Sequence, residues 1–359
     1  MLAGLSEILS IALPVGFGLL TLFLIAFLTP IAARLKLIDA PSERKHHGAL
    51  VPTVGGIAIY TTLIVANLYF DLPEKVSWLI YSGGILVILG GLDDAFSLGV
   101  RFRLIVQIGA TCVMMYGTGL WITSIGITSD TLAPVLMVLG PPFTIFCVVG
   151  LVNALNMMDG IDGLAAGQTL ISIVLLITFV FVQNGEVYRL DWVILLCTSV
   201  FSFLIVNLSL TPLQKVFLGD AGSLLLGFIL AWTLIYFSQA PVGLVDPAIV
   251  LWCVTIPAFD ALCVASYRHK NRISPFESGR HHLHHIFLAH GLSSVGTLLV
   301  ISILSLTFGF FGLFLSLIFS DLVVVIAWFI CLFIYFSIFY LRRFEFSSAN
   351  KKAESKPKL

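Results

Sequence analysis

Four groups of polar residues have types and spacings that could bind a divalent cation or a phosphate. The first is the pair Asp93-Asp94, which follows two glycines at the end of an apolar stretch. Two adjacent carboxylates repel each other, and each tends to take up a proton unless a cation lies nearby. A helix cap or an acid in a hydrated loop also explains the pair when it is considered alone.

The second group places an amide or a carboxylate at every third position, at Asn153, Asn156, Asp159 and Asp162. Positions three apart on a helix share a broad face, although each step drifts by about 60°. Each of the two acids is followed by glycine, so tight turns are the alternative. Clustered hard oxygen ligands suit Mg²⁺ or Mn²⁺ far better than zinc.

The third group surrounds Asp220, which lies among small residues at the start of another apolar stretch, Gly219-Asp220-Ala221-Gly222-Ser223. A simple helix N-cap explains this acid, because Asp performs that role well. The small neighbours favour a second interpretation, since they let backbone amides approach a phosphate closely.

The fourth group is Arg280-His281-His282-Leu283-His284-His285, within a polar connection that spans residues 268–291. A helix would place His281, His284 and His285 on one face. A structural zinc site, which needs three or four ligands, and a merely hydrated loop are the alternatives. We favour phosphate binding or proton transfer, for which arginine and histidine are suited.

A further polar segment, residues 36–56, contains Lys45 in a basic stretch and ends in Gly55-Gly56. The topology of membrane insertion explains the basic residues equally well. The glycine pair indicates close helix packing rather than a phosphate loop, because no strand–loop–helix context surrounds it. Lys45, Thr53 and Arg103 are weaker candidates for phosphate binding.

The composition identifies the environment in which these groups must act. The chain has 359 residues, of which 59% are hydrophobic and 11% charged, whereas about a quarter of the residues of soluble domains are charged. With 19 basic and 19 acidic residues, the chain is neither a nucleic-acid binder nor a disordered protein. The six cysteines lie in apolar stretches without paired spacing, so disulfides and a cysteine metal site are not expected.

We therefore expect an all-α, polytopic transmembrane bundle, because a bilayer core about 30 Å thick needs roughly 20 apolar residues per helix. The first basic residue is Arg34, so the apolar N-terminus is expected to be a retained anchor rather than a signal peptide. A single transmembrane domain would occupy residues 1–346, followed by a polar tail at 347–359. About eleven spans are predicted, near residues 8–33, 50–70, 76–91, 104–120, 132–152, 164–183, 191–210, 222–240, 247–267, 295–319 and 321–341.

The basic residues predict the orientation of these spans. Only Lys75 and Arg189 of the 19 lie in even-numbered connections, which leaves 17 in the odd-numbered connections and the tail. Basic residues stay on the cytoplasmic side during insertion. The C-terminus and the four polar groups are therefore expected on the cytoplasmic face, and the N-terminus on the periplasmic face.

One membrane face would thus carry at least four carboxylates surrounded by Arg, Lys and His. One or two divalent cations would let such a cluster hold phosphates and stabilise the charge of phosphoryl transfer. A phosphoryl acceptor at the bilayer edge would be a lipid phosphate. Composition and spacing do not identify the donor.

At these motifs the chain resembles the polyprenyl-phosphate N-acetylhexosamine-1-phosphate transferases, and most of all their bacterial GlcNAc branch. The similarity extends from Asp39 to the histidine segment with the motifs in family order, and Asn156-Met157-Met158-Asp159-Gly160-Ile161-Asp162-Gly163 is its most specific part. The resemblance implies transfer of GlcNAc-1-phosphate from UDP-GlcNAc to undecaprenyl phosphate, with Mg²⁺ or Mn²⁺ and release of UMP. It also implies the bacterial inner membrane and the first lipid-linked step of O-antigen or enterobacterial common antigen synthesis.

The resemblance also implies roles for individual residues. One of Asp93 and Asp94 would deprotonate the lipid phosphate, and Asn156, Asp159 and Asp162 would surround the metal and the nucleotide. Asp220 would bind the metal with help from Asp159 or Asp94, and Phe217 would stack on uracil. The residues expected around the diphosphate are Arg280, His282, His284 and His285, with His284 and His285 counted among the catalytic residues and Lys45 among the substrate-binding ones.

Four questions stay open at this stage. Leu283 divides the histidines, whereas the peptidoglycan transferase that uses UDP-MurNAc-pentapeptide carries three in a row, so a small UDP-HexNAc is favoured over that donor. Direct attack by the lipid phosphate is the favoured mechanism, and a covalent intermediate on a carboxylate is the competing one. A transporter or flippase would place ionisable groups near the bilayer midplane, whereas here the deepest acid is Asp260. A homodimer is left open.

Overall fold

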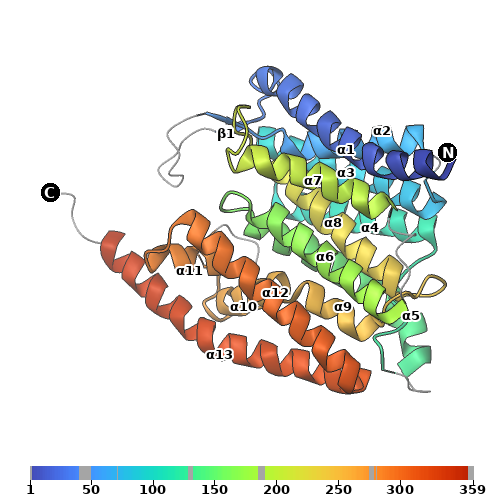
Figure 1. Ribbon diagram of the computed structural model, residues 1–359. Coiled ribbons are helices and arrows are strands. Elements are labelled where there is room, and N and C mark those ends of the chain that lie inside the picture. Colours follow the sequence, from blue (N-terminus) through green and yellow to red (C-terminus); the bar gives the residue numbers. More distant parts are fainter. Residues whose placement is uncertain are drawn as a thin grey trace.

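The computed structural model describes residues 2–39, 50–70, 72–127, 132–184, 191–274, 279 and 281–354. Within them the chain is a bundle of α-helices, as predicted (Figure 1). One short antiparallel ladder joins β1 (Ile38–Asp39) to β2 (Val51–Pro52). Lys45 lies in the connection between these strands, outside the described residues.

The helices follow the predicted spans closely. They are α1 (Leu2–Leu28), α2 (Gly55–Tyr69), α3 (Glu74–Phe96), α4 (Val100–Thr118), α5 (Leu132–Met158), α6 (Leu164–Asn184), α7 (Asp191–Asn207), α8 (Gly219–Ser238), α9 (Pro247–Cys253), α10 (Thr255–Lys270), α11 (Leu283–Ala289), α12 (Ser294–Ile318) and α13 (Asp321–Glu354), with a short 3-10 turn, η1, at Thr29–Ile31. The last helix continues thirteen residues past the predicted end of its span at 341, into the polar segment.

The protein is a multi-pass membrane protein. Seven described helices are long and apolar enough to cross a bilayer, and an eighth span is formed if α9 and α10, bent by 75° at their junction, count as one. Helices α2 and α7 are apolar but shorter. Length and composition of the described helices therefore support seven or eight membrane spans, and the predicted number of eleven is not confirmed.

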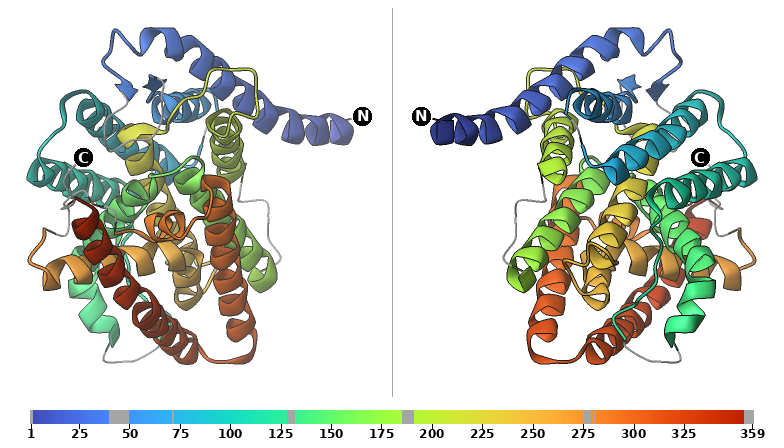
Figure 2. Two further views of the ribbon diagram at one scale, coloured as in Figure 1. Left: turned by 90° about the vertical axis from the view of Figure 1, so that its left-hand side faces the viewer. Right: turned by 90° about the vertical axis from the view of Figure 1, so that its right-hand side faces the viewer.

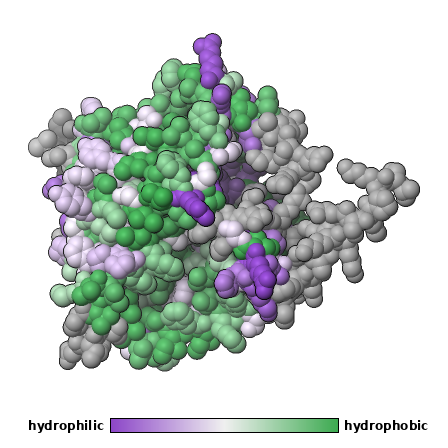
Figure 3. Space-filling view, turned by 180° about the vertical axis from the view of Figure 1, so that it is seen from behind, coloured by the Kyte–Doolittle hydropathy of each residue, from purple (hydrophilic) through white to green (hydrophobic). Residues whose placement is uncertain are grey.

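Helix α8 forms the centre of the bundle (Figures 1 and 2). Its most apolar window is 94% buried, against 22% for α1 and for the described part of α13. A helix that is apolar on all sides belongs in an interior, and Trp232, Phe228 and Phe237 of α8 are completely covered. Hydrophobic side chains cover much of the outer surface instead, as expected for helices that face lipid (Figure 3).

Glycines bring α2 and α3 against the first turn of α8. A Cβ on Gly56 would lie 2.1 Å from the Cα of Gly222, and a Cβ on Gly90 would lie 2.3 Å from the amide nitrogen of Ala221. Backbone pairing continues this contact, because the amide of Gly56 donates to the carbonyl of Leu218 at 2.9 Å. The expectation that Gly55-Gly56 serves helix packing is confirmed.

The small residues around Asp220 also serve packing. Gly222 lies against Gly56, and the amide nitrogen of Asp220 donates to Asp94. These contacts place the start of α2, the end of α3 and the start of α8 together at one end of the bundle.

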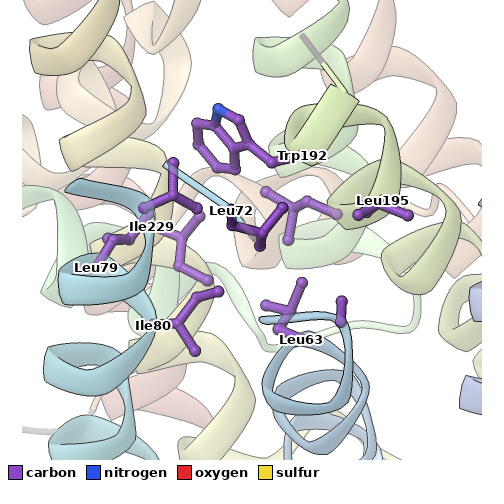
Figure 4. Close-up of a pocket in the computed structure, with 10 residues that line it drawn as sticks. Leu63, Leu72, Leu79, Ile80, Trp192, Leu195 and Ile229 are labelled. Carbon is purple, nitrogen blue, oxygen red and sulfur yellow. The ribbon is translucent and has the colours of Figure 1, made fainter. Parts of the chain in front are cut away.

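A narrow apolar cavity lies between the same helices, in the half of the bundle away from that end (Figure 4). Its walls come from the later part of α2, the first turns of α3, and α7 and α8, with Leu63, Leu79, Trp192 and Ile229 among them. It offers only hydrocarbon and aromatic surface, so it is not a site for a phosphate-bearing substrate.

Candidate active site

Three of the predicted motifs meet at the end of the bundle where α8 begins. Asp94 lies in the last turn of α3, and its Oδ1 accepts a hydrogen bond from the amide of Asp220 at 3.1 Å. The Asn156 Nδ2, near the end of α5, donates to Asp220 Oδ1 and to Ser223 Oγ, each at 2.8 Å. Residues separated by more than sixty positions therefore form one polar cluster, defined by Asp94, Asn156, Asp220 and Ser223.

The two adjacent aspartates have different surroundings. Asp93 is buried, and its oxygens accept hydrogen bonds from the Leu98 amide at 2.6 Å and from Arg103 Nη1 at 2.5 Å. The same guanidinium nitrogen lies 3.9 Å from Asp220 Oδ2. Asp94 Oδ2, in contrast, is buried and has no hydrogen-bond partner among the residues that the structure describes. Asp93 thus fixes Arg103, and Asp94 is the acid with an oxygen to offer a ligand.

The Asn-Asp repeat combines a helix with a turn. Helix α5 ends at Met158, so Asn156 is helical, whereas Asp159 and Asp162 lie in the following turns. Asn153 points elsewhere, since its Nδ2 donates to Gln107 Oε1 of α4 at 2.7 Å. The prediction of one shared helical face is wrong for this reason, and the Asp-Gly turn alternative is correct for the second half.

Asp159 faces the other acids across this turn. The pKa of its carboxyl is raised to about 8, first by surrounding protein that limits its hydration and then by the negative charges of Asp220, Asp94 and Asp162. Its residue is nevertheless exposed to solvent, so the carboxyl is crowded by other acids and still accessible. A cation placed among these carboxylates would relieve their repulsion.

Lys215 and Phe217 form a second side of the site. The Lys215 Nζ lies 2.5 Å from Asp162 Oδ2 and 5.2 Å from the centre of the Phe217 ring. Two hydrogen bonds hold the backbone of Phe217. Its amide donates to the Pro52 carbonyl, and its carbonyl accepts from the Gly55 amide. Phe217 is half-buried, and these backbone contacts do not involve its ring.

The histidine segment approaches the same turn. His282 and His284 are buried at the start of α11, and His285 is half-buried, with its ring centre 4.1 Å from that of His284. A Cβ on Gly160 would lie 2.3 Å from His284 Nε2, an atom for which the described part of the chain supplies no hydrogen-bond partner. The histidines therefore lie next to the Asp159–Asp162 turn.

His281 and Arg280 lie before the start of α11. His281 precedes α11 and lies beside the Tyr267 ring at 4.9 Å, so the prediction that it shares a helical face with His284 and His285 is wrong. A proline-free polar stretch gave no signal of where the helix begins. Arg280 lies outside the described residues.

His284 predicts an acid-dependent loss of stability. Burial and the neighbouring His285 and His282 lower its pKa to about 3, so the folded protein keeps the ring neutral while the unfolded chain protonates it below about pH 6.5. The neutral His284 ring therefore contributes to the free energy of unfolding. This contribution is fully present above pH 6.5 and is lost as the pH falls toward 3, by at most about 1.4 kcal/mol per pH unit. Thermal unfolding of purified protein between pH 7.5 and 5 should show a steeper decline for wild type than for His284→Gln. Equal slopes would contradict the assignment.

The acidic residues fit a hard divalent cation. In the part of the chain that the structure describes, no three His, Cys, Asp or Glu side chains already form a ligand set for one ion. The donors are carboxylate and amide oxygens, however, which Mg²⁺ and Mn²⁺ prefer. The buried, unpartnered Asp94 Oδ2 is the atom that a cation would satisfy.

Two residues of this region were absent from the predicted site. Ser223 follows Asp220 by one turn of α8, and helical spacing within the noted motif could have identified it. Asp260 of α10 accepts a hydrogen bond from His282. Its signal was the carboxylate itself, placed deep within an apolar span.

Comparisons with known proteins agree with this arrangement. Residues 76–238 match glycosyl transferase family 4. The chain is 34% identical over 282 residues to undecaprenyl-phosphate alpha-N-acetylglucosaminyl 1-phosphate transferase of Yersinia pestis, which covers 76% of each chain. It is 33% identical over 279 residues to the protein of that name from Escherichia coli (strain K12), covering 76% of this chain and 75% of that one.

A more distant relative gives the same result. The probable undecaprenyl-phosphate N-acetylglucosaminyl 1-phosphate transferase of Bacillus subtilis (strain 168) is 30% identical over 299 residues, covering 81% of each chain. The family match includes Asp94, Asn156 and Asp220, the residues that meet in the polar cluster. The chain therefore belongs to glycosyl transferase family 4, among its polyprenyl-phosphate N-acetylhexosamine-1-phosphate transferases.

Proposed function

We propose that this enzyme transfers GlcNAc-1-phosphate from UDP-GlcNAc to undecaprenyl phosphate and releases UMP. The observation that carries the proposal is the convergence of Asp94, Asn156, Asp159 and Asp220, with Arg103 beside them, at one end of a membrane bundle. The names of the relatives favour GlcNAc over another HexNAc or MurNAc-pentapeptide. The distribution of basic residues favours the cytoplasmic face of the bacterial inner membrane.

Asp94, Asp159 and Asp220 would hold the Mg²⁺ or Mn²⁺ ion. When bound, the ion would neutralise charge on the diphosphate of the donor. Asn156 keeps one Asp220 oxygen in place by its hydrogen bond. Asp93 holds Arg103 so that its guanidinium stays close to Asp220.

Catalysis of this phosphoryl transfer depends mainly on positioning the two substrates and on stabilising the charge of the phosphate oxygens. An oxygen of the lipid phosphate bonds to the β-phosphorus of the donor, and the bond from that phosphorus to the bridging oxygen breaks. UMP leaves with the electron pair. Arg103 and the histidines next to Gly160 offer donors to the phosphate oxygens, whose charge shifts in this step.

Phe217 is the proposed support for the uracil ring. Base–aromatic stacking contributes about 1–3 kcal/mol, so Phe217→Ala should raise KM for UDP-GlcNAc roughly tenfold. Because the backbone contacts with Pro52 and Gly55 do not involve the ring, the site should keep its shape. Phe217→Tyr is the matched control and should stay within about threefold of wild type. Steady-state UMP release at varied donor concentration measures both, and an unchanged KM in Phe217→Ala would remove Phe217 from the nucleotide site.

The proposed reaction is tested by UMP release from UDP-GlcNAc by detergent-purified protein. Release should require undecaprenyl phosphate, stop with a chelator and return with added Mg²⁺ or Mn²⁺. Parallel reactions with UDP-GalNAc and UDP-MurNAc-pentapeptide test the donor. UMP release that is the same with and without the lipid, and with and without the chelator, would contradict the proposal. Faster UMP release from another donor would identify that donor, rather than UDP-GlcNAc, as the substrate.

A further inference from the structure

Asp260 is a buried acid on α10 and does not belong to the polar cluster of Asp94, Asn156, Asp220 and Ser223. It is 1% exposed. Its Oδ2 lies 2.8 Å from His282 Nδ1, and its Oδ1 accepts from the Leu283 amide at 3.0 Å and from the Tyr335 hydroxyl of α13 at 3.3 Å. A buried carboxylate is costly unless donors surround it, and here the start of α11 supplies two donors and α13 supplies the third.

The bend between α9 and α10 and the packing of α13 make this arrangement possible. Helix α10 follows a 75° break after α9, and its Asp260 contacts the histidine segment at His282 and Leu283. Trp328 of α13 donates to Thr255 Oγ1 at the start of α10 at 3.2 Å, and Phe259 packs against both Trp328 and Tyr335. Asp260 of α10 therefore contacts both α13 and the first turn of α11.

The contact determines which nitrogen of His282 can act. An ionised carboxylate only accepts hydrogen bonds, so His282 Nδ1 carries a proton in this pair. Nε2 is then the ring nitrogen left for a substrate. A carboxylate that orients a histidine from behind, through the nitrogen remote from the chemistry, also stabilises a positive charge on the ring.

The imidazole ring of His284 lies between His282 and the Asp159–Asp162 turn. Its imidazole is stacked with that of His284, with ring centres 6.0 Å apart and planes within 7°. His284 in turn lies against Gly160, between Asp159 and Asp162. Asp260, His282, His284 and Gly160 thus form a continuous line from the interior of the bundle to the site.

We propose that Asp260 is a positioning residue that fixes the proton on His282 Nδ1 and turns Nε2 toward a phosphate of the nucleotide sugar. This inference rests on the proposed transferase reaction. The carboxylate touches no substrate and acts through the ring, whose positive charge it supports when Nε2 donates to the phosphate. Such supporting contacts typically change activity by about 10- to 100-fold.

The variant Asp260→Asn separates this role from a purely structural one. Asparagine keeps an oxygen that can accept from Leu283 and Tyr335, but it turns an amide donor toward His282. The ring must then accept at Nδ1 and loses its negative partner. We expect kcat to fall about 10- to 100-fold with KM for UDP-GlcNAc within about threefold. Tyr335→Phe removes a donor from the same carboxylate without touching His282 and should remain close to wild type.

A double-mutant cycle provides the decisive comparison. If Asp260 acts through His282, then Asp260→Asn should cost less than about twofold in a His282→Gln background. Equal losses in both backgrounds would show a structural role and overturn the proposal.

Nitrogen-15 NMR of histidine-labelled protein tests the pair without the reaction. The His282 signals, assigned by their absence in His282→Gln, should show a protonated Nδ1 in wild type and an unprotonated Nδ1 in Asp260→Asn. The same ring state in both proteins would also overturn the proposal. If wild-type protein releases no UMP while the NMR result is as expected, the proposed reaction fails and the Asp260–His282 pair does not.

Discussion

Replacing Asp94 by asparagine should lower kcat by about 1,000-fold while leaving the protein folded. Asparagine keeps the oxygen that accepts the Asp220 amide, which preserves the contact between α3 and α8. It replaces the buried, unpartnered Oδ2 with a donor that cannot bind a cation. The loss should therefore come from charge and metal binding, with the geometry of the bundle retained.

The matched control is Asp246→Asn. Asp246 precedes α9 and lies close to Gln183, whose Nε2 is 3.1 Å from Asp246 Oδ2. It belongs to neither the acidic cluster nor the histidine segment, so its variant should keep wild-type activity. UMP release is the measurement. A variant Asp94→Asn with more than about a tenth of wild-type kcat would show that this carboxylate neither binds the ion nor acts in the reaction.

The largest effect through packing is expected at Gly90. A methyl group there would lie 2.3–2.4 Å from the backbone of Ala221 and Asp220, closer than any Cβ can approach, so Gly90→Ala must push α3 away from α8. A displacement of about 1 Å between reacting groups can cost about 100-fold in rate. We expect at least that loss, together with a lower thermal midpoint.

The neighbouring Gly91→Ala is the control for this variant. A Cβ at Gly91 meets nothing within 4 Å, and alanine favours helix over glycine by up to about 1 kcal/mol. This variant should retain activity and be as stable as wild type or more so. If Gly90→Ala behaves like Gly91→Ala, then the close contact between α3 and α8 does not position Asp94 against Asp220.

Much of the helical architecture could be predicted because lipid demands continuous apolar segments. Because every membrane-spanning segment must be apolar, the sequence of a segment does not show how deeply its helix is buried in the bundle. Nothing in the apolar sequence distinguishes α8, which is buried on all sides, from α1 or α12, which expose a broad apolar face. The 75° break between α9 and α10 has a local signal, because Pro257 in the first turn of α10 cannot donate a helical hydrogen bond to the carbonyl of Cys253, but the local sequence does not give the angle of the break.

The candidate site was predictable at the level of motifs and less so at the level of atoms. Asp94, Asn156 and Asp220 are connected as expected. The sequence did not distinguish Asp93 from Asp94, because Arg103 of α4 and the Leu98 amide engage only the first. Asp260 was noticed for its depth alone, since its partner His282 is more than twenty residues away.

The most direct test of the account is a titration of purified protein in lipid nanodiscs with Mn²⁺, followed by electron paramagnetic resonance. We expect one tightly bound ion per chain, with an affinity that falls at least about tenfold in both Asp94→Asn and Asp220→Asn and is unchanged in Asp246→Asn. Wild-type Mn²⁺ affinity in both of the first two variants would contradict it.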